Sequence, residues 1–282
     1  MIYDKLIRAD ELLPRLGDAN WLIFDCRFDL ADTAKGESLY RQSHIPGAIY
    51  AHLDRHLSSP ITANSGRHPL PRQDELVEWL AQCGLRKDTQ VVVYDDSFGA
   101  MASRLWWLLK CLGHQTVALL DGGWQAWQKQ SLAEDALIPL LTPSSFNAVY
   151  DKQYMVDTDA VLDNLQTGEF QLVDVRSVER FSGKLEPIDP IAGHIPGALN
   201  RPLSDNLDAQ GLFKPAQVLK DYYAPLQVDW TSRQQVFMCG SGVTACHSVL
   251  AMVIAGYPMP RLYTGSWSEW IRDNTRPVVT SI

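Results

Sequence analysis

The sequence lacks the long apolar segments that cross membranes, because none of its hydrophobic runs approaches the roughly 18 residues required. It also lacks an excess of positive charge. Its formal net charge is −8 at pH 7, which argues against nucleic acid and anionic membrane surfaces as partners. The first residues show no basic region followed by an apolar core, so we expect no signal peptide. An acidic protein can still bind an anionic substrate at a local cluster of N–H donors.

Cysteine is scarce, and its pattern excludes two common uses. The five cysteines are an odd number, show no spacing of a small disulfide-rich scaffold and include no Cys-x-x-Cys pair that would indicate zinc. We therefore expect reduced thiols, a cytoplasmic protein and no metal site. The cysteines are Cys26, Cys83, Cys111, Cys239 and Cys246.

What the chain has is enough apolar sequence for packed cores and a clear internal repeat. Of its 282 residues, 46% are hydrophobic and 21% are charged, which fits one large or two ordinary domains. Three motifs recur in the same order at a nearly constant offset of 143 to 150 residues, which indicates tandem duplication. The pairs are Asp25-Cys26-Arg27 with Asp174-Val175-Arg176, His44-Ile45-Pro46-Gly47-Ala48 with His194-Ile195-Pro196-Gly197-Ala198, and Gly122-Gly123-Trp124-Gln125-Ala126-Trp127 with Gly265-Ser266-Trp267-Ser268-Glu269-Trp270.

Strand and helix patterns alternate within each copy. Residues 91–94 and 236–238 are short β-branched or apolar runs that predict buried strands, and residues 100–112 predict a helix. Such alternation favours an α/β fold in which each domain is a mostly parallel sheet flanked by helices. The expected boundaries are residues 1–135 for the first domain, 136–152 for a proline-containing linker and 153–282 for the second domain.

The most informative stretch runs from Val236 to Thr244. It combines a short apolar strand with a turn that contains two glycines, and Cys239 is the first residue of that turn. Glycine lets backbone N–H groups point inward, and inward N–H groups beside a helix N-terminus bind anions. A lone cysteine is more often buried and inert. The strand–turn–helix context instead favours a reactive thiolate at Cys239.

The residues Cys239 to Thr244, Cys-Gly-Ser-Gly-Val-Thr, resemble the active-site loop of the rhodanese superfamily, and within it the 3-mercaptopyruvate sulfurtransferases. The thiosulfate sulfurtransferases of this family usually carry arginine and lysine where Gly240 and Ser241 stand. Its phosphatase relatives need an arginine at the sixth position after the cysteine to grip phosphate bidentately. Ala245 occupies that position, which argues against phosphatase chemistry.

The resemblance covers nearly the whole chain and implies two tandem rhodanese-like domains, with the chemistry in the second. Alignment of the two copies places Asp95 at the position of Cys239, and an aspartate cannot carry sulfane sulfur. The resemblance therefore implies that Cys239 is the catalytic residue and that no metal or organic cofactor takes part. It implies substrate binding by Arg180, Gly240, Ser241, Gly242, Val243 and Thr244.

Two features leave alternatives open. The family's mercaptopyruvate enzymes carry a second arginine where Ile188 stands, so recognition of an α-keto acid depends on Arg180 alone in the sequence. Ser241 either contacts substrate or is a small turn residue. His44, with Asp29 or Asp32, could form a relay with Ser241, but the matching His194 favours a structural turn shared by both copies.

The function that follows from the resemblance is sulfur transfer. The donor is expected to be 3-mercaptopyruvate, and the acceptor a thiol, a thioredoxin-like dithiol or cyanide. A first alternative is the same chemistry with thiosulfate as the donor. A second alternative, from another class, is a persulfide-binding module with little turnover.

Overall fold

The computed structural model of the protein describes residues 2–227, 231 and 234–281. Contacts divide the chain into two compact units. Unit 1 contains Met1–Ser59, Leu70–Asp151 and Gln210–Leu212, and unit 2 contains Pro60–Pro69, Lys152–Ala209 and Phe213–Ile282.

Unit 1 is built on a five-stranded sheet in the order β1-β5-β4-β2-β3, and all of its strand pairs are parallel. The strands are β1 (Leu6–Ile7), β2 (Trp21–Asp25), β3 (Ile49–Tyr50), β4 (Gln90–Tyr94) and β5 (Val117–Leu120). The helices are α1 (Ala9–Leu12), η1 (Leu13–Arg15), α2 (Lys35–Gln42), α3 (Leu53–His56), α4 (Gln73–Gln82), α5 (Ala102–Cys111) and α6 (Gly123–Lys129).

Unit 2 repeats this topology, with a parallel sheet in the order β6-β10-β9-β7-β8. The strands are β6 (Met155–Val156), β7 (Gln171–Asp174), β8 (Leu199–Asn200), β9 (Gln235–Met238) and β10 (Arg261–Tyr263). The helices are η2 (Lys152–Tyr154), α7 (Thr158–Thr167), α8 (Val178–Ser182), η3 (Leu203–Asn206), α9 (Ala216–Tyr223), η4 (Ala224–Gln227), α10 (Ala245–Ile254) and α11 (Ser266–Trp270). The predicted fold, two α/β domains with parallel sheets, is confirmed.

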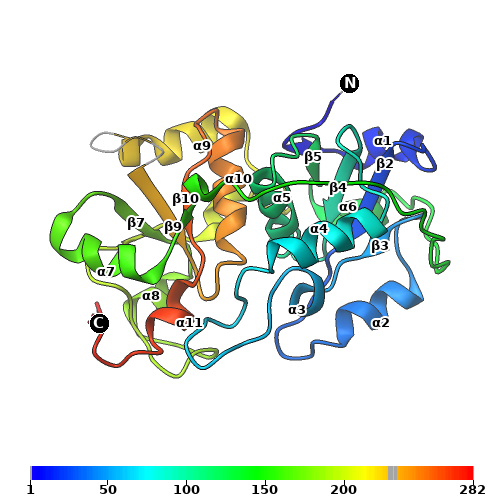
Figure 1. Ribbon diagram of the computed structural model, residues 1–282. Coiled ribbons are helices and arrows are strands. Elements are labelled where there is room, and N and C mark those ends of the chain that lie inside the picture. Colours follow the sequence, from blue (N-terminus) through cyan, green and yellow to red (C-terminus); the bar gives the residue numbers. More distant parts are fainter. Residues whose placement is uncertain (1, 228–230, 232–233, 282) are drawn as a thin grey trace. The chain divides into compact units, whose positions relative to one another are not determined.

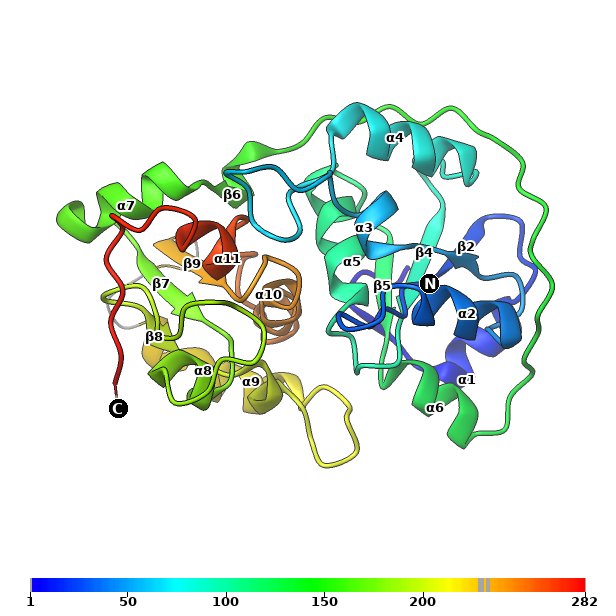
Figure 2. The ribbon, with the colours of Figure 1, turned by 90° about the horizontal axis from the view of Figure 1, so that it is seen from below.

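The central strands β4 and β9 are buried along their whole length because helices cover both faces of each sheet. Val92 and Tyr94 of β4 pack in a core with α1 and α6, while α5 contacts the same strand separately. In unit 2, Val236 and Met238 pack in a core with α7 and α11, and α10 also contacts β9. In both views α10 lies on one side of the unit 2 sheet and α7 on the other (Figures 1 and 2).

Buried tryptophans pack within these layers. Trp106 and Trp107 of α5 have no exposed surface, and neither do Trp267 and Trp270 of α11. Burial of such large side chains contributes strongly to stability. These four tryptophans therefore have a packing role.

The predicted linker contains no helix or strand from Leu137 to Tyr150, and Figure 2 shows this green segment as extended chain. It belongs to unit 1, where the Ser144 N–H donates to the carbonyl oxygen of Ala81 at 2.9 Å and the Tyr150 hydroxyl donates to that of Pro71 at 3.2 Å. Among the described residues, no helix has the length and apolar character needed to span a membrane.

Two short segments belong to the unit that holds the opposite repeat. Residues 60–69 lie between α3 and α4 in the sequence, yet they belong to unit 2. Gln210–Leu212 lies between η3 and α9, yet it belongs to unit 1. The two segments occupy matching places in the two repeats. Each repeat therefore contributes this segment to the other unit.

We expect acid to destabilise the protein through His56. Its ring stacks on Trp79 at 4.5 Å between centroids, and burial lowers the pKa of His56 from 6.5 to about 4. Between these values the unfolded chain binds a proton that the folded chain does not bind, so the free energy of unfolding falls as pH falls from 6.5 towards 4. Urea unfolding at about pH 7.5 and about pH 5 measures this fall, which should be smaller in His56→Gln. An equal fall in the variant would contradict this origin.

Candidate active site

The loops that follow β4 and β9 are similar and not identical, because Gly99 of the first loop also has a positive φ of 90°, and α5 begins at Ala102 whereas α10 begins at Ala245. Asp95 begins the first loop and Cys239 begins the second. Three residues later, Phe98 and Gly242 both have positive φ, at 56° and 75°. A Cβ on Gly242 would lie 2.3 Å from the carbonyl oxygen of Thr264, so this close approach together with the left-handed backbone requires glycine.

In unit 1 the loop closes around a carboxylate. Asp95 is fully buried, and its two oxygens accept hydrogen bonds from four backbone N–H groups. Burial raises the pKa of Asp95, and these N–H groups oppose the rise. The four donors, at 2.7 to 2.9 Å, belong to Ser97, Gly99, Met101 and Ala102.

In unit 2 the same position holds Cys239, which is 1% exposed. Its backbone N–H donates to the Ser266 hydroxyl at 3.2 Å, and its carbonyl oxygen accepts from the Trp267 N–H at 3.1 Å. Ser266 has a φ of 54°, a left-handed conformation that is uncommon for serine. Its hydroxyl donates to the carbonyl oxygen of Tyr263 at 2.9 Å. This strained residue at the start of α11 thus fixes the backbone of Cys239.

Helix α10 begins directly after the loop. It runs for ten residues from Ala245, so the positive end of its dipole lies at the loop. The unit 1 loop is one residue longer before its helix, since α5 begins at Ala102 and α10 begins at Ala245, but both loops lead from the central strand into a helix N-terminus. The arrangement therefore suits an anionic sulfur on Cys239.

Arg180 lies beside this loop, as the sequence suggested. The carboxylate of Glu186 accepts from Arg180 Nε at 2.9 and 3.0 Å, and Asp189 accepts from Arg180 Nη2 at 2.9 Å. A Cβ built on Gly240 would lie 3.4 Å from Arg180 Nη2. Both carboxylate side chains are 3% exposed, so they hold the guanidinium in a defined position.

The sequence analysis missed Arg67, a second arginine at the same loop. Its backbone N–H donates to the Ser268 hydroxyl at 3.0 Å, its guanidinium pairs with Asp189, and its Nη2 lies 2.9 Å from a Cβ built on Gly240. Burial lowers the pKa of Arg67, whereas the negative charge of Cys239 raises it.

The sequence analysis also missed His68, which is buried and contacts the Ser241 hydroxyl through Nδ1 at 2.7 Å. The relay considered for His44 is wrong, because both ring nitrogens of His44 contact carbonyl oxygens, of Tyr40 at 2.6 Å and of Leu137 at 3.2 Å. His194 contacts the carbonyl oxygen of Phe181 in the same way, at 2.8 Å. The shared structural turn is therefore confirmed.

One signal in the sequence could have found Arg67 and His68. They form a basic pair in a loop that follows strand β3 and helix α3. In parallel sheets, segments beyond the carboxyl ends of strands line ligand sites. The assignment of residues 60–69 to the other unit, however, has no signature in sequence periodicity.

The two arginines that follow strands β2 and β7 have a structural role. Arg27 and Arg176 form buried ion pairs with Asp25 and Asp174, each at 2.6 Å. Arg176 also lies over the Trp267 ring at 4.6 Å. These pairs fix the strand ends beside the two loops.

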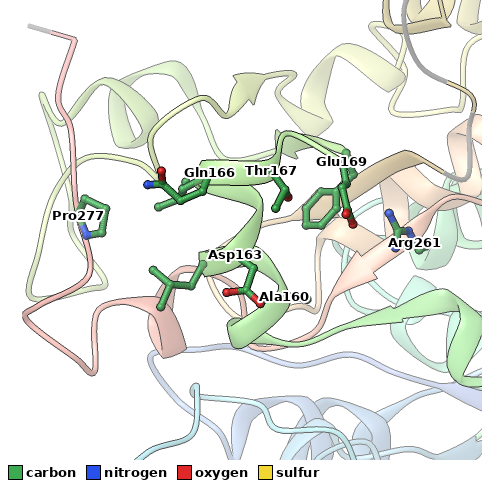
Figure 3. A pocket seen from close by; sticks show the side chains of 10 residues that line it. Ala160, Asp163, Gln166, Thr167, Glu169, Arg261 and Pro277 are labelled. Carbon is green, nitrogen blue, oxygen red and sulfur yellow. The ribbon is translucent and has the colours of Figure 1, made fainter.

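Figure 3 shows a separate surface pocket of about 640 Å³ in unit 2, between α7 and the start of β10. Arg261, the first residue of β10, lies at its edge, and none of its lining residues belongs to the Cys239 loop. Because β9 and β10 are parallel, this pocket and Cys239 lie towards opposite ends of the strands. The pocket is not part of the candidate site.

Comparison with known proteins agrees with this geometry. The rhodanese-like domain family matches residues 8–130 and 157–273. A probable 3-mercaptopyruvate sulfurtransferase of Pseudomonas aeruginosa is 45% identical over 278 residues, which cover 98% of each chain. A putative thiosulfate sulfurtransferase of Mycobacterium tuberculosis is 38% identical, over 91% of this chain and 89% of that protein. The structure of 3-mercaptopyruvate sulfurtransferase from Leishmania major superposes with a TM-score of 0.85 at 29% identity, over 98% of this chain and 76% of that chain.

Two parallel-sheet units, each with a loop of this kind after its central strand, define a tandem rhodanese fold. The chain belongs to the rhodanese-like domain family, which it matches in two copies.

We expect Asp95→Asn to destabilise unit 1 and to leave turnover intact. The asparagine NH₂ group would face N–H donors that now have a carboxylate as acceptor. Unsatisfied buried groups of this kind cost about 1–3 kcal/mol. Urea unfolding measures the loss, with the exposed Asp88→Asn as a control. Wild-type stability in Asp95→Asn, or a collapse of kcat in folded protein, would contradict the structural role of Asp95.

Proposed function

We propose that the protein is a sulfurtransferase that takes sulfur from 3-mercaptopyruvate onto Cys239 and passes it to a thiol or cyanide acceptor. The proposal rests on the position of Cys239 in the fold. It lies where unit 1 holds the Asp95 carboxylate on four N–H groups, in a loop that leads into the N-terminus of α10, and this position would favour an anionic sulfur.

The reaction proceeds in two halves. The Cys239 thiolate attacks the donor sulfur, an S–S bond forms, and the C–S bond breaks. The bonding electrons leave as the enolate of pyruvate, which a proton converts to pyruvate. An acceptor thiolate or cyanide then attacks the outer sulfur and restores the Cys239 thiolate. The loop N–H groups stabilise the anionic sulfur in both halves.

Ser241 and His68 suit a role in the proton transfers of this cycle. The Ser241 hydroxyl is two residues from Cys239 and lies 2.7 Å from Nδ1 of the buried His68. A hydroxyl and an imidazole in contact can relay a proton between the donor and the site. We assign substrate binding to the loop residues 240–244, which directly follow Cys239 in the sequence.

Thiosulfate as the donor is the second candidate, and one observation favours it. Two guanidinium groups flank Gly240, so the site is more basic than its loop sequence indicates. A side chain at position 240 would meet Arg67, because a Cβ built there lies 2.9 Å from Arg67 Nη2. 3-Mercaptopyruvate remains the proposed donor, because its single carboxylate needs fewer positive charges in the site than the doubly charged thiosulfate.

The cysteines indicate the cellular compartment in which the reaction takes place. All five cysteines are buried, their number is odd, and we place the reaction in a reducing compartment, the cytoplasm. A small sulfur donor and a small or protein-borne thiol are the partners that the chemistry needs.

Cys239→Ser should abolish sulfur transfer and leave the fold intact, because a hydroxyl cannot hold a persulfide. Mass spectrometry of donor-treated wild type should find one added sulfur on the Cys239 peptide. Added sulfur on Cys83 or Cys111, together with an active Cys239→Ser variant, would refute the assignment of Cys239 as the residue that carries the sulfur.

Donor preference tests the substrate. We expect a higher kcat/KM with 3-mercaptopyruvate than with thiosulfate, and a fall of about ten- to hundredfold with mercaptopyruvate in Arg180→Ala, since a charge-assisted hydrogen bond is lost. The exposed Arg72→Ala is the matched control. Preference of the wild type for thiosulfate would make the second candidate the correct one.

A further inference from the structure

The two arginines at the loop, Arg180 and Arg67, differ in which of their guanidinium nitrogens are left to bind a ligand. Arg180 uses Nε and Nη2 for Glu186 and Asp189. One edge of its guanidinium is therefore already occupied by protein carboxylates, and its Nη1 remains for another partner.

Arg67 shows the opposite pattern. Its Nη1 pairs with Asp189. Its Nε is buried and has no hydrogen-bond partner among the residues that the structure describes. Nη2, on the same edge as Nε, lies 2.9 Å from a Cβ built on Gly240. The Nε–Nη2 edge of a guanidinium binds a carboxylate through two parallel hydrogen bonds.

The position of Arg67 is fixed, and its side chain is partly exposed. Asp189 accepts from both arginines and is only 3% exposed on its side chain, so it holds the two guanidinium groups beside each other. The backbone N–H of Arg67 is anchored on Ser268, whose own N–H donates to the Gly240 carbonyl oxygen at 2.8 Å. The Arg67 side chain as a whole is 23% exposed, while its Nε is buried.

Ile188 cannot supply the contact that Arg67 offers. It is 44% exposed and apolar, and it stands in the loop between Glu186 and Asp189. The positive charge missing at this position is present at Arg67, which comes from the first repeat and lies in unit 2.

We propose that Arg67 binds the carboxylate of an α-keto-acid donor through its Nε–Nη2 edge, with Arg180 contributing Nη1 and Asp189 holding both arginines. This inference rests on the proposed function, because the carboxylate is that of the donor. It makes Arg67 a determinant of donor specificity.

A pair of alkylating reagents tests the proposal without turnover. 3-Bromopyruvate and bromoacetone are both α-bromo ketones that alkylate a thiolate, and only the first carries a carboxylate. Mass spectrometry of the Cys239 peptide gives the rate for each. We expect the bromopyruvate-to-bromoacetone rate ratio to fall about ten- to hundredfold in Arg67→Ala, and less in Arg67→Lys, which keeps the charge and loses the planar edge. Arg72→Ala, an exposed arginine, should leave the ratio unchanged.

Steady-state kinetics and a rescue variant complete the test. In Arg67→Ala, kcat/KM for 3-mercaptopyruvate should fall by about the same factor as the bromopyruvate-to-bromoacetone rate ratio. Adding Ile188→Arg to this variant should partly restore kcat/KM and the rate ratio. An unchanged ratio in Arg67→Ala, or an equal slowing of the two reagents, would overturn the proposal. A falling ratio in a protein whose wild type transfers no sulfur would refute the proposed function and leave Arg67 as a carboxylate-binding residue.

Discussion

The structure depends on one constraint, which is that a ring of inward backbone N–H groups at the end of a central strand needs an anion. Unit 1 meets it with Asp95, whose carboxylate accepts four N–H bonds. Unit 2 places Cys239 at the same point, where a thiolate or persulfide can take the place of the carboxylate. The loop of unit 1 thus binds the carboxylate of its own first residue, and the corresponding loop of unit 2 is the candidate catalytic loop.

The candidate site is completed by a segment that the repeat does not predict. Arg67 and His68 belong to residues 60–69 of the first repeat, and these residues are part of unit 2. They bring a guanidinium to Gly240 and an imidazole to Ser241. The loop of unit 2 therefore contacts residues that the first copy supplies, so both copies contribute to the candidate site.

Local sequence was sufficient for the fold and for the centre of the site. The β-branched run of β4 and the apolar run of β9 predicted the central strands, and the repeated motifs predicted the duplication. Cys239 and Arg180 were found because short motifs mark them. His44 was considered for a relay because its motif is conspicuous, yet both of its ring nitrogens contact backbone carbonyl oxygens and stabilise a structural turn. Arg67 was missed because its contacts with Asp189 and Gly240 bridge 122 or more residues, and no periodic pattern records such a contact.

The central claim is that a single cysteine, Cys239, receives the sulfur of the donor. Rapid mixing of the protein with excess 3-mercaptopyruvate in the absence of an acceptor tests it most directly, with pyruvate as the readout. Our account predicts a burst of about one pyruvate per chain as the persulfide forms, followed by a slower phase in which the thiol of the excess donor removes the outer sulfur. No burst, or a burst of equal size in Cys239→Ser, would contradict it.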